Sequence, residues 1–149
     1  MAFQAPTEDQ CPFCAYLSGS VPCAFVTRRS LVSVFMNRAQ FERGAALVIP
    51  NAHLTSLLEL DRDTMTAVFE ESQRMAKAMV RVLGAVGLNM FQNNGVNAGQ
   101  TVSHYHVHLV PRYPTSQPER IFRAAELSHT PVAELTKIAN ELRAALEQA

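Results

Sequence analysis

The segment His104-Tyr105-His106-Val107-His108-Leu109-Val110 carries three of the five histidines of this chain, at alternate positions. Alternation of polar and apolar residues has the period of a β-strand, so an extended backbone places the three imidazoles on one face and the apolar side chains on the other. Neighbouring histidines are then roughly 6.5 to 7 Å apart, a spacing at which they can surround a small anionic or metal-bound group. The segment therefore predicts a strand that carries a functional site.

The flanking sequence predicts further strands. Short stretches rich in β-branched or aromatic residues, separated by polar or glycine-containing breaks, occur at 25–27, 31–36, 45–49 and 88–93. The histidine strand itself is expected over 103–110, with Pro111 as its end. Together with the two helices expected below, the order of these strands predicts an antiparallel sheet.

A long helix is expected from Asp61 to about Leu83. Its apolar residues have the three-and-four spacing of one buried face: Met65, Val68, Phe69, Ala76, Met79 and Leu83. Asp61 or Asp63 is available as N-cap and Gly84 as the end. Thr130 and Pro131 open a second helix, over about 131–147. Strands, a helix, two strands and a closing helix predict an α+β fold, and the lack of repeats or a linker predicts a single domain over 1–149.

Composition narrows the classes of function. Thirteen Lys and Arg balance thirteen Asp and Glu, so no basic excess indicates nonspecific binding to nucleic acid or to an acidic membrane. The first ten residues are polar and acidic, and the apolar runs are too short to span a bilayer, so we expect a cytoplasmic protein. Two of the three cysteines form Cys11-Pro12-Phe13-Cys14, a spacing that indicates metal or redox chemistry before a structural disulfide.

The motifs resemble those of the histidine triad (HIT) family of nucleotide hydrolases and transferases. The matching stretches are Asn93-Asn94-Gly95, Ala98-Gly99-Gln100-Thr101-Val102, the segment 104–112, Leu47-Val48-Ile49-Pro50 followed by His53, and the Cys11 and Cys14 pair. The resemblance spans 11–112 and leaves the last third of the chain unmatched by strong motifs. It implies a HIT-like fold, with a five-stranded antiparallel sheet, a long central helix and a C-terminal helix.

The resemblance also implies an activity. Such proteins cleave at the α-phosphate of dinucleoside polyphosphates or of purine nucleoside phosphoramidates, through a covalent nucleotidyl-histidine, so the ligand would carry an AMP- or GMP-type moiety. His106 matches the nucleophile, which must be a neutral imidazole whose other nitrogen is held as N–H. His108 would lie beside the phosphate oxygens or leaving group, and the side chain of Gln100 would hydrogen-bond the phosphate or leaving group during catalysis. No organic cofactor is expected.

Other residues match positions that bind the substrate. Asn93 and Thr101 would hydrogen-bond the phosphate or leaving group, and Gly99 lies in a loop that can turn sharply and offer backbone N–H groups to an anion. Gly95 belongs to the same loop. The loop alone would predict only a turn.

The first half of the chain carries the residues expected to recognise the nucleoside. Phe13, Tyr16 and Phe35 match an apolar base pocket, although ordinary core packing explains each aromatic equally well. Asn37 lies where the family usually has an acidic residue that holds the ribose hydroxyls. An amide lacks the charge that strengthens such a contact, so ribose binding should be weaker or the preferred sugar altered.

A structural zinc site is expected beside the histidine row. Cys11 and Cys14 supply two ligands, and the resemblance implies His53 and His104 as the other two, completing a tetrahedral set. Such a site would pin the N-terminal segment to the sheet and add directly to folding stability. The alternative is an unmetallated pair of thiols with His53 in a loop.

Other functions remain open at this point. One is a noncatalytic nucleotide-binding dimer, and another is a zinc-dependent hydrolase that uses the histidine row as metal ligands. The resemblance implies a homodimer, for which Met65, Met75 and Met79 offer an adaptable helix face, although such faces are more often core. The segment 112–123 would either close over the site or cross to the last helix.

Overall fold

A computed structural model describes residues 3–117, 119 and 128–148. Its elements in chain order are α1 (Pro12–Ser18), β1 (Phe25–Arg28), β2 (Val32–Met36), β3 (Ala46–Pro50), the 3-10 turn η1 (Leu57–Glu59), α2 (Arg62–Leu83), β4 (Gly87–Phe91), the 3-10 turn η2 (Val96–Ala98), β5 (Val107–Arg112) and α3 (Val132–Glu147). The five strands form one antiparallel sheet in the order β1-β2-β3-β5-β4. The predicted α+β fold with a five-stranded sheet is confirmed.

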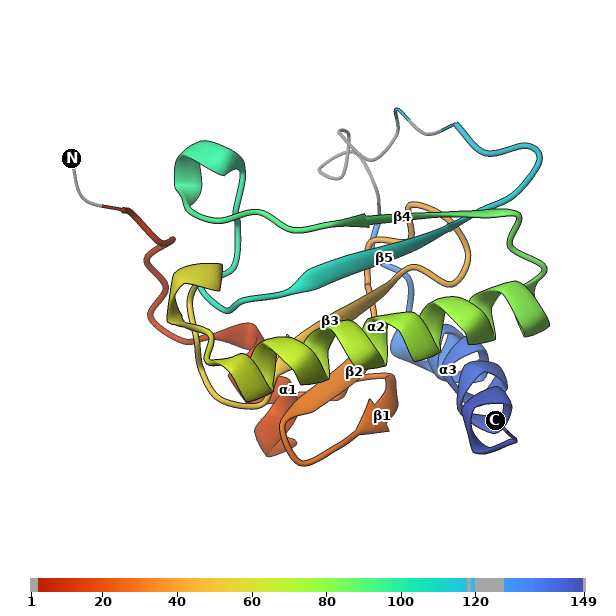
Figure 1. The fold of residues 1–149 in the computed structure, drawn as a ribbon, viewed down its shortest axis with the longest axis horizontal. Helices are drawn as coiled ribbons and strands as arrows, with labels where there is room; N and C mark the ends of the chain where they lie inside the picture. Colours follow the sequence, from red (N-terminus) through yellow and green to blue (C-terminus); the bar gives the residue numbers. More distant parts are fainter. Residues whose placement is uncertain (1–2, 118, 120–127, 149) are drawn as a thin grey trace.

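The sheet separates two layers. The helices α2 and α3 cover one face, where they pack on alternate residues of the central strands such as Val34, Val48 and Leu109 (Figure 1). The short helix α1 lies against the opposite face, where Phe13 packs on Phe35 and on neighbouring apolar residues. The strands are apolar on both faces because both faces are covered. The histidine row belongs to the face that α1 covers.

The helix α2 begins and ends where its sequence predicts. The Asp61 side chain accepts a hydrogen bond from the backbone N–H of Thr64 at 2.7 Å, and Gly84 ends the helix with a left-handed φ of 69°, a conformation that glycine adopts without strain. The predicted buried face is only partly correct. Met65 and Phe69 are exposed, and the side chains that do point into the core are Val68, Met75, Ala78 and Met79.

The structure corrects the bounds of the histidine strand. β5 begins at Val107 and not at Ser103, because its pairing with β3 starts at Val107 and the chain before it turns toward the loop at Leu54, whose carbonyl accepts the Tyr105 N–H at 2.6 Å. Pro111 also lies inside β5 instead of ending it. β3 pairs no further than Leu109, so a residue without an N–H breaks no ladder bond on that side.

Three further expectations are not settled by the described residues. No helix within 3–117, 119 or 128–148 combines the length and the apolar character that crossing a membrane requires; a cytoplasmic location stays a prediction. The segment 112–123, expected either to close over the site or to cross to the last helix, is described only at 112–117 and 119, so neither alternative is tested. The extent of the domain also stays a prediction.

Candidate active site and metal centre

His106 is held in one tautomer by the backbone. Its Nδ1 atom lies 2.7 Å from the carbonyl oxygen of His104, so Nδ1–H donates this bond and Nε2 keeps its lone pair. The side chain is only 5% exposed, and burial lowers its pKa below the ordinary value. The ring also meets Phe13 edge to face, at 5.3 Å between centroids. His106 is therefore a neutral imidazole with a defined acceptor nitrogen.

His108 lies next to His106 and is fixed by stacking. The two imidazole centroids are 5.0 Å apart, and the His108 ring is parallel to Phe91 at 4.4 Å. Burial, with a smaller contribution from the nearby His106, lowers its pKa to about 3. Among the described residues its buried Nδ1 atom has no hydrogen-bond partner. His108 is thus a neutral, half-buried ring whose Nδ1 atom is shielded from solvent.

Gln100 braces the loop before the histidines. Its Oε1 accepts the Gly95 N–H at 2.6 Å, and its Nε2 donates to the carbonyls of Thr55 at 2.7 Å and Val102 at 2.9 Å. The side chain is 4% exposed. All three bonds are internal, so in this structure Gln100 positions the loop, and its predicted direct part in catalysis stays a prediction.

The other loop residues have the accessibility that a ligand contact needs. Asn93 is half-buried and its amide donates to the Gly99 carbonyl at 3.3 Å. Gly99 has a left-handed φ of 82° at the end of η2, and both Gly99 and Thr101 are exposed. The 3-10 turn η2 within the connection was not foreseen from the sequence.

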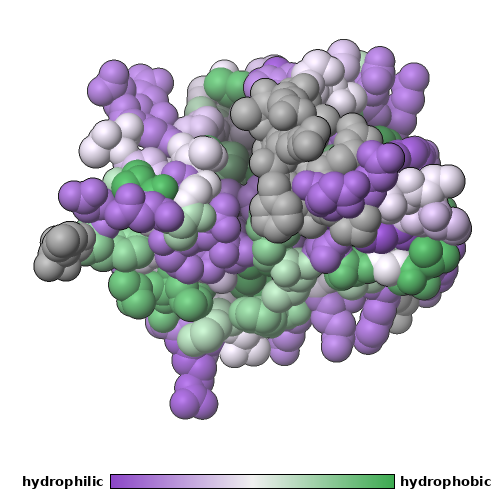
Figure 2. Space-filling view, turned by 90° about the horizontal axis from the view of Figure 1, so that it is seen from above, coloured by the Kyte–Doolittle hydropathy of each residue, from purple (hydrophilic) through white to green (hydrophobic). Residues whose placement is uncertain are grey.

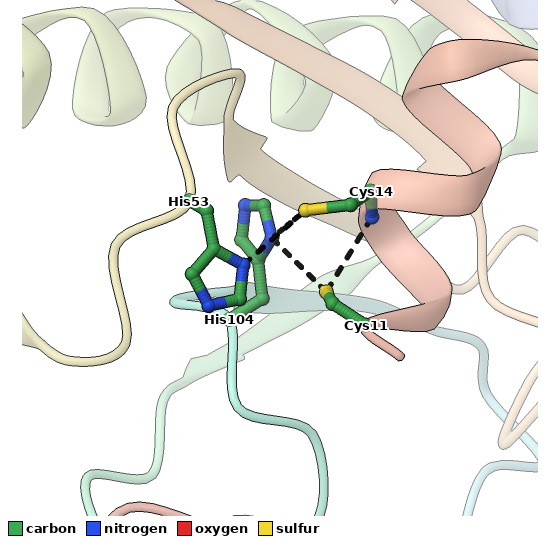
Figure 3. Close-up of side chains that lie close together, drawn as sticks. All are labelled: Cys11, Cys14, His53 and His104. Atoms are coloured by element: carbon green, nitrogen blue, oxygen red, sulfur yellow. Dashed lines mark hydrogen bonds between the residues drawn. The ribbon is translucent and has the colours of Figure 1, made fainter. Parts of the chain in front are cut away.

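The four expected metal ligands converge on one point (Figure 3). Cys11 and Cys14 come from the start of α1, His53 from the loop after β3, and His104 from the segment before β5. The Cys14 sulfur lies 3.2 Å from Nδ1 of His53 and 3.7 Å from Nδ1 of His104, and the Cys11 sulfur lies 3.4 Å from the latter atom. All four ligand atoms are within 4.8 Å of one another.

These distances fit a tetrahedral zinc ion. Bond lengths of about 2.3 Å to sulfur and 2.05 Å to nitrogen place the two ligand atoms roughly 3.6 Å apart. The Nε2–H of His104 donates to the Pro50 carbonyl at 2.9 Å, which turns the lone pair of Nδ1 toward the sulfurs, as metal-bound imidazoles require. Burial, and after it the neighbouring Cys11, raise the pKa of the Cys14 thiol to about 11, so its deprotonation is unfavourable without a metal. A bound cation stabilises the thiolate and offsets this cost.

The family relationship follows from comparison with known proteins. A family model described as HIT domain matches residues 18–115. The chain belongs to the HIT domain family. The protein named hit from Bacillus subtilis is 35% identical over 105 residues, which is 70% of this chain and 72% of the relative.

Two further HIT relatives bear on the site. A chain from Schizosaccharomyces pombe named adenosine 5'-monophosphoramidase hnt1 is 31% identical over 102 residues, 68% of this chain and 74% of the relative. A solved structure described as a Zn-bound histidine triad family protein from Mycobacterium smegmatis is 32% identical, with a TM-score of 0.78, and covers 93% of this chain and 94% of its own.

The residues expected to recognise the nucleoside lie beside the HIT motif. Phe35 is only 2% exposed and packs on Phe13 and Tyr16, so these aromatics form a core cluster under the histidines. Asn37 is half-buried, and its Oδ1 accepts the Ala39 N–H at 3.1 Å. The amide oxygen of Asn37 therefore already has a backbone partner.

Several residues that shape the HIT site were not identified from the sequence. Phe91 stacks on His108, and the carbonyls of Pro50 and His104 fix the two other imidazoles. Phe91 lies opposite His108 in the β4–β5 pairing. This neighbour of His108 could have been identified only if the register of the two strands had been known. Backbone carbonyls leave no signal in a sequence.

Proposed function

We propose that this HIT protein is a nucleotidyl hydrolase or transferase. Its substrate is a nucleoside monophosphate, with an AMP- or GMP-type moiety, joined to its leaving group by a phosphoramidate or phosphoanhydride bond. The observation that carries the proposal is the hydrogen bond from His106 Nδ1–H to the His104 carbonyl, since it leaves Nε2 as a buried, unprotonated nucleophile.

The reaction has two balanced steps. In the first, the Nε2 lone pair of His106 forms a bond to the α-phosphorus, the bond from phosphorus to the bridging nitrogen or oxygen breaks, and the leaving group departs with that electron pair and a proton taken from water. In the second, the oxygen of water or of an acceptor bonds to phosphorus and gives its proton to solvent, while the bond from phosphorus to Nε2 breaks and its electron pair returns to the imidazole. The His104 carbonyl stabilises the cationic ring between the steps.

The surrounding residues would stabilise the phosphate. The half-buried amide of Asn93, the hydroxyl of Thr101 and the backbone at Gly99 lie in the loop that Gln100 braces. The half-buried imidazole of His108, next to His106, would lie beside the phosphate oxygens or the leaving group. Gln100 holds this loop through its three internal bonds, and its direct contact with the phosphate or leaving group stays a prediction.

We also propose that Cys11, Cys14, His53 and His104 hold a structural zinc ion. The support is the tetrahedral spacing of their ligand atoms and the bond from His104 to the Pro50 carbonyl. When bound, zinc would cross-link α1, the loop after β3 and the segment before β5. It would not take part in the reaction, because His106 and His108 are not in the ligand set.

A homodimer is the proposed assembly. The exposed apolar side chains Met65, Phe69 and Val80 lie on α2, and Met90 is exposed on the edge strand β4. Figure 2, which views the molecule from the β4 side, shows apolar side chains gathered along its lower part. An unpaired edge strand beside an apolar helix face is a surface that a second copy can cover.

The decisive experiment is detection of the covalent intermediate. Intact-mass measurement during turnover of adenosine 5'-phosphoramidate should show the protein with one added AMP group, and His106→Asn should abolish both adduct and turnover while AMP binding persists. His129→Asn, which changes an exposed histidine outside the row, should behave as wild type. Turnover that survives His106→Asn would contradict the proposal.

The same variant separates the competing functions. A noncatalytic binding protein shows no turnover of phosphoramidates or dinucleoside polyphosphates before the substitution. A hydrolase that used the histidine row to hold its zinc would lose the metal in His106→Asn, whereas we expect the zinc content to stay unchanged.

A further inference from the structure

A basic groove lies on the helix-covered side of the sheet, away from the histidine row. One hollow of about 350 Å³ lies between β1, α2 and α3, and a second of about 310 Å³ continues along α2 and α3. Both are lined by Arg74 and Leu146, so they form one groove. The basic residues that line it, besides Arg28, are Arg29, Arg74, Lys77, Arg81 and Arg143.

Three of these arginines are held in place by contacts that leave donors for a ligand. Nε and Nη2 of Arg143 donate to the carbonyls of Val26 and Phe25, at 3.1 and 2.5 Å. Arg29 and Arg74 each donate to Glu71, at 3.2 and 2.8 Å. Nη1 of Arg143 also donates to Asn140 at 2.9 Å. A guanidinium has five N–H donors, so Arg143 retains two, and Arg29 and Arg74 retain more. Preorganised arginines bind phosphate oxygens with little loss of side-chain freedom.

The local charge is positive although the whole chain is neutral. Glu71 is 3% exposed and is already surrounded by Arg29, Arg74 and the hydroxyl of Thr27. Glu71 lies behind the groove and does not line it; among the described residues Glu147 is the one carboxylate that lines the two hollows. Arg28 turns away, because its Nη2 donates to the Leu17 carbonyl beside α1. The remaining cations exceed the two carboxylates, and a concave surface concentrates their field.

The lining indicates which kind of anion fits. Among the described residues no aromatic side chain lines either hollow, and the apolar part consists of small or aliphatic residues such as Ala78 and Ala145. A nucleobase would therefore find no ring to stack on. The donors instead follow one another along the groove, from Arg143 and Arg74 to Lys77 and Arg81, which suits several linked phosphates.

We propose that this groove binds an oligophosphate, a chain of two or more linked phosphate groups, at a site separate from the histidine row. Arg74 lies at the junction of the two hollows and contacts the ligand from either one. Arg29 and Arg143 hold one end, and Lys77 and Arg81 hold the other. The groove and the histidine row lie on opposite faces of the sheet, so the two sites can be occupied independently.

Titration calorimetry with inorganic tripolyphosphate tests the proposal. Wild type should bind one tripolyphosphate per chain, more weakly as NaCl rises. Arg74→Gln should weaken binding about tenfold or more, since a charge-assisted contact is lost. Lys77→Gln with Arg81→Gln should also weaken it; these side chains anchor no backbone, so this variant should fold normally. Arg62→Gln, an exposed arginine of α2 outside the groove, is the matched control and should bind as wild type.

The His106→Asn variant locates the bound anion. It should bind tripolyphosphate as wild type does, because the groove does not involve the histidine row; this result is independent of the proposed hydrolase activity. Absence of binding to wild type would overturn the proposal. So would binding that is lost in His106→Asn but kept in Arg74→Gln, or a loss in Arg62→Gln equal to that in Arg74→Gln, which would indicate general charge attraction.

Discussion

The carbonyl oxygen of His104 accepts the Nδ1–H of His106 at 2.7 Å, while the side chain of His104 faces Cys11 and Cys14. One residue thus connects the cysteine-histidine cluster to the neighbouring imidazole. Its Nε2–H bond to Pro50 fixes the ring from the other side. The position of the proposed nucleophile is therefore set by the same residue that completes the proposed metal site.

Loss of the metal should destabilise the protein. We expect wild type to contain one zinc per chain and Cys11→Ser with Cys14→Ser to contain almost none, with a melting temperature lower by at least about 5 °C. Metal analysis and thermal unfolding measure both effects. Cys23→Ser is the matched control, because this cysteine packs in the second apolar cluster and is outside the metal set. Equal zinc contents in the two variants would refute the assignment.

Removing the Gln100 side chain should weaken the loop. Gln100→Ala leaves the Gly95 N–H and the carbonyls of Thr55 and Val102 without their partner, which should cost about 2 kcal/mol or more of unfolding free energy. Urea unfolding measures this loss. Gln73→Ala, on the exposed side of α2, should cost less than about 0.5 kcal/mol. If Gln100→Ala abolished turnover at unchanged stability, Gln100 would act on the substrate directly.

Acid should destabilise the fold partly through His108. Its pKa is about 3 in the folded chain against an ordinary 6.5, so the unfolded chain takes up the proton first as pH falls. The stability that neutral His108 provides is complete above about pH 6.5 and is lost toward pH 3, with a slope of at most about 1.4 kcal/mol per pH unit. His108→Asn should reduce this slope. Measuring both chains in the background of Cys11→Ser with Cys14→Ser removes the pH dependence of metal binding; identical slopes would contradict the prediction.

The two faces of α2 should respond differently to substitution. Met75 is fully buried, so Met75→Ala should lower the free energy of unfolding in urea by about 2 to 5 kcal/mol.

Phe69 is 49% exposed, and Phe69→Glu should instead shift a dimer to monomer, because a charge would be buried in the proposed interface. Sedimentation velocity measures the second effect. Wild type that sediments as a monomer at every concentration would exclude this dimer.

The local features of the chain were predictable because they depend on neighbours in sequence. The alternation at 104–110 placed Val107 and Leu109 on the core face and the histidines on the other, although His104 and His106 precede the strand. The ends of α2 were predictable for the same reason: an Asp61 cap and a terminal Gly84 are recognisable from residue type alone.

The sequence by itself predicted the five strands, the long helix α2, the closing helix α3 and the candidate site residues, because periodicity, capping and ligand type are properties of short segments; the short helix α1 was not predicted. Only the tertiary structure decided which ring nitrogen of His104 is protonated, which stripe of α2 is buried, and that arginines from α2, from α3 and from the residue after β1 share one groove. These features depend on residues far apart in the chain, such as Pro50 for His104 and Glu71 for Arg29. The position of such partners follows from the packing of the whole sheet, and no local pattern records it.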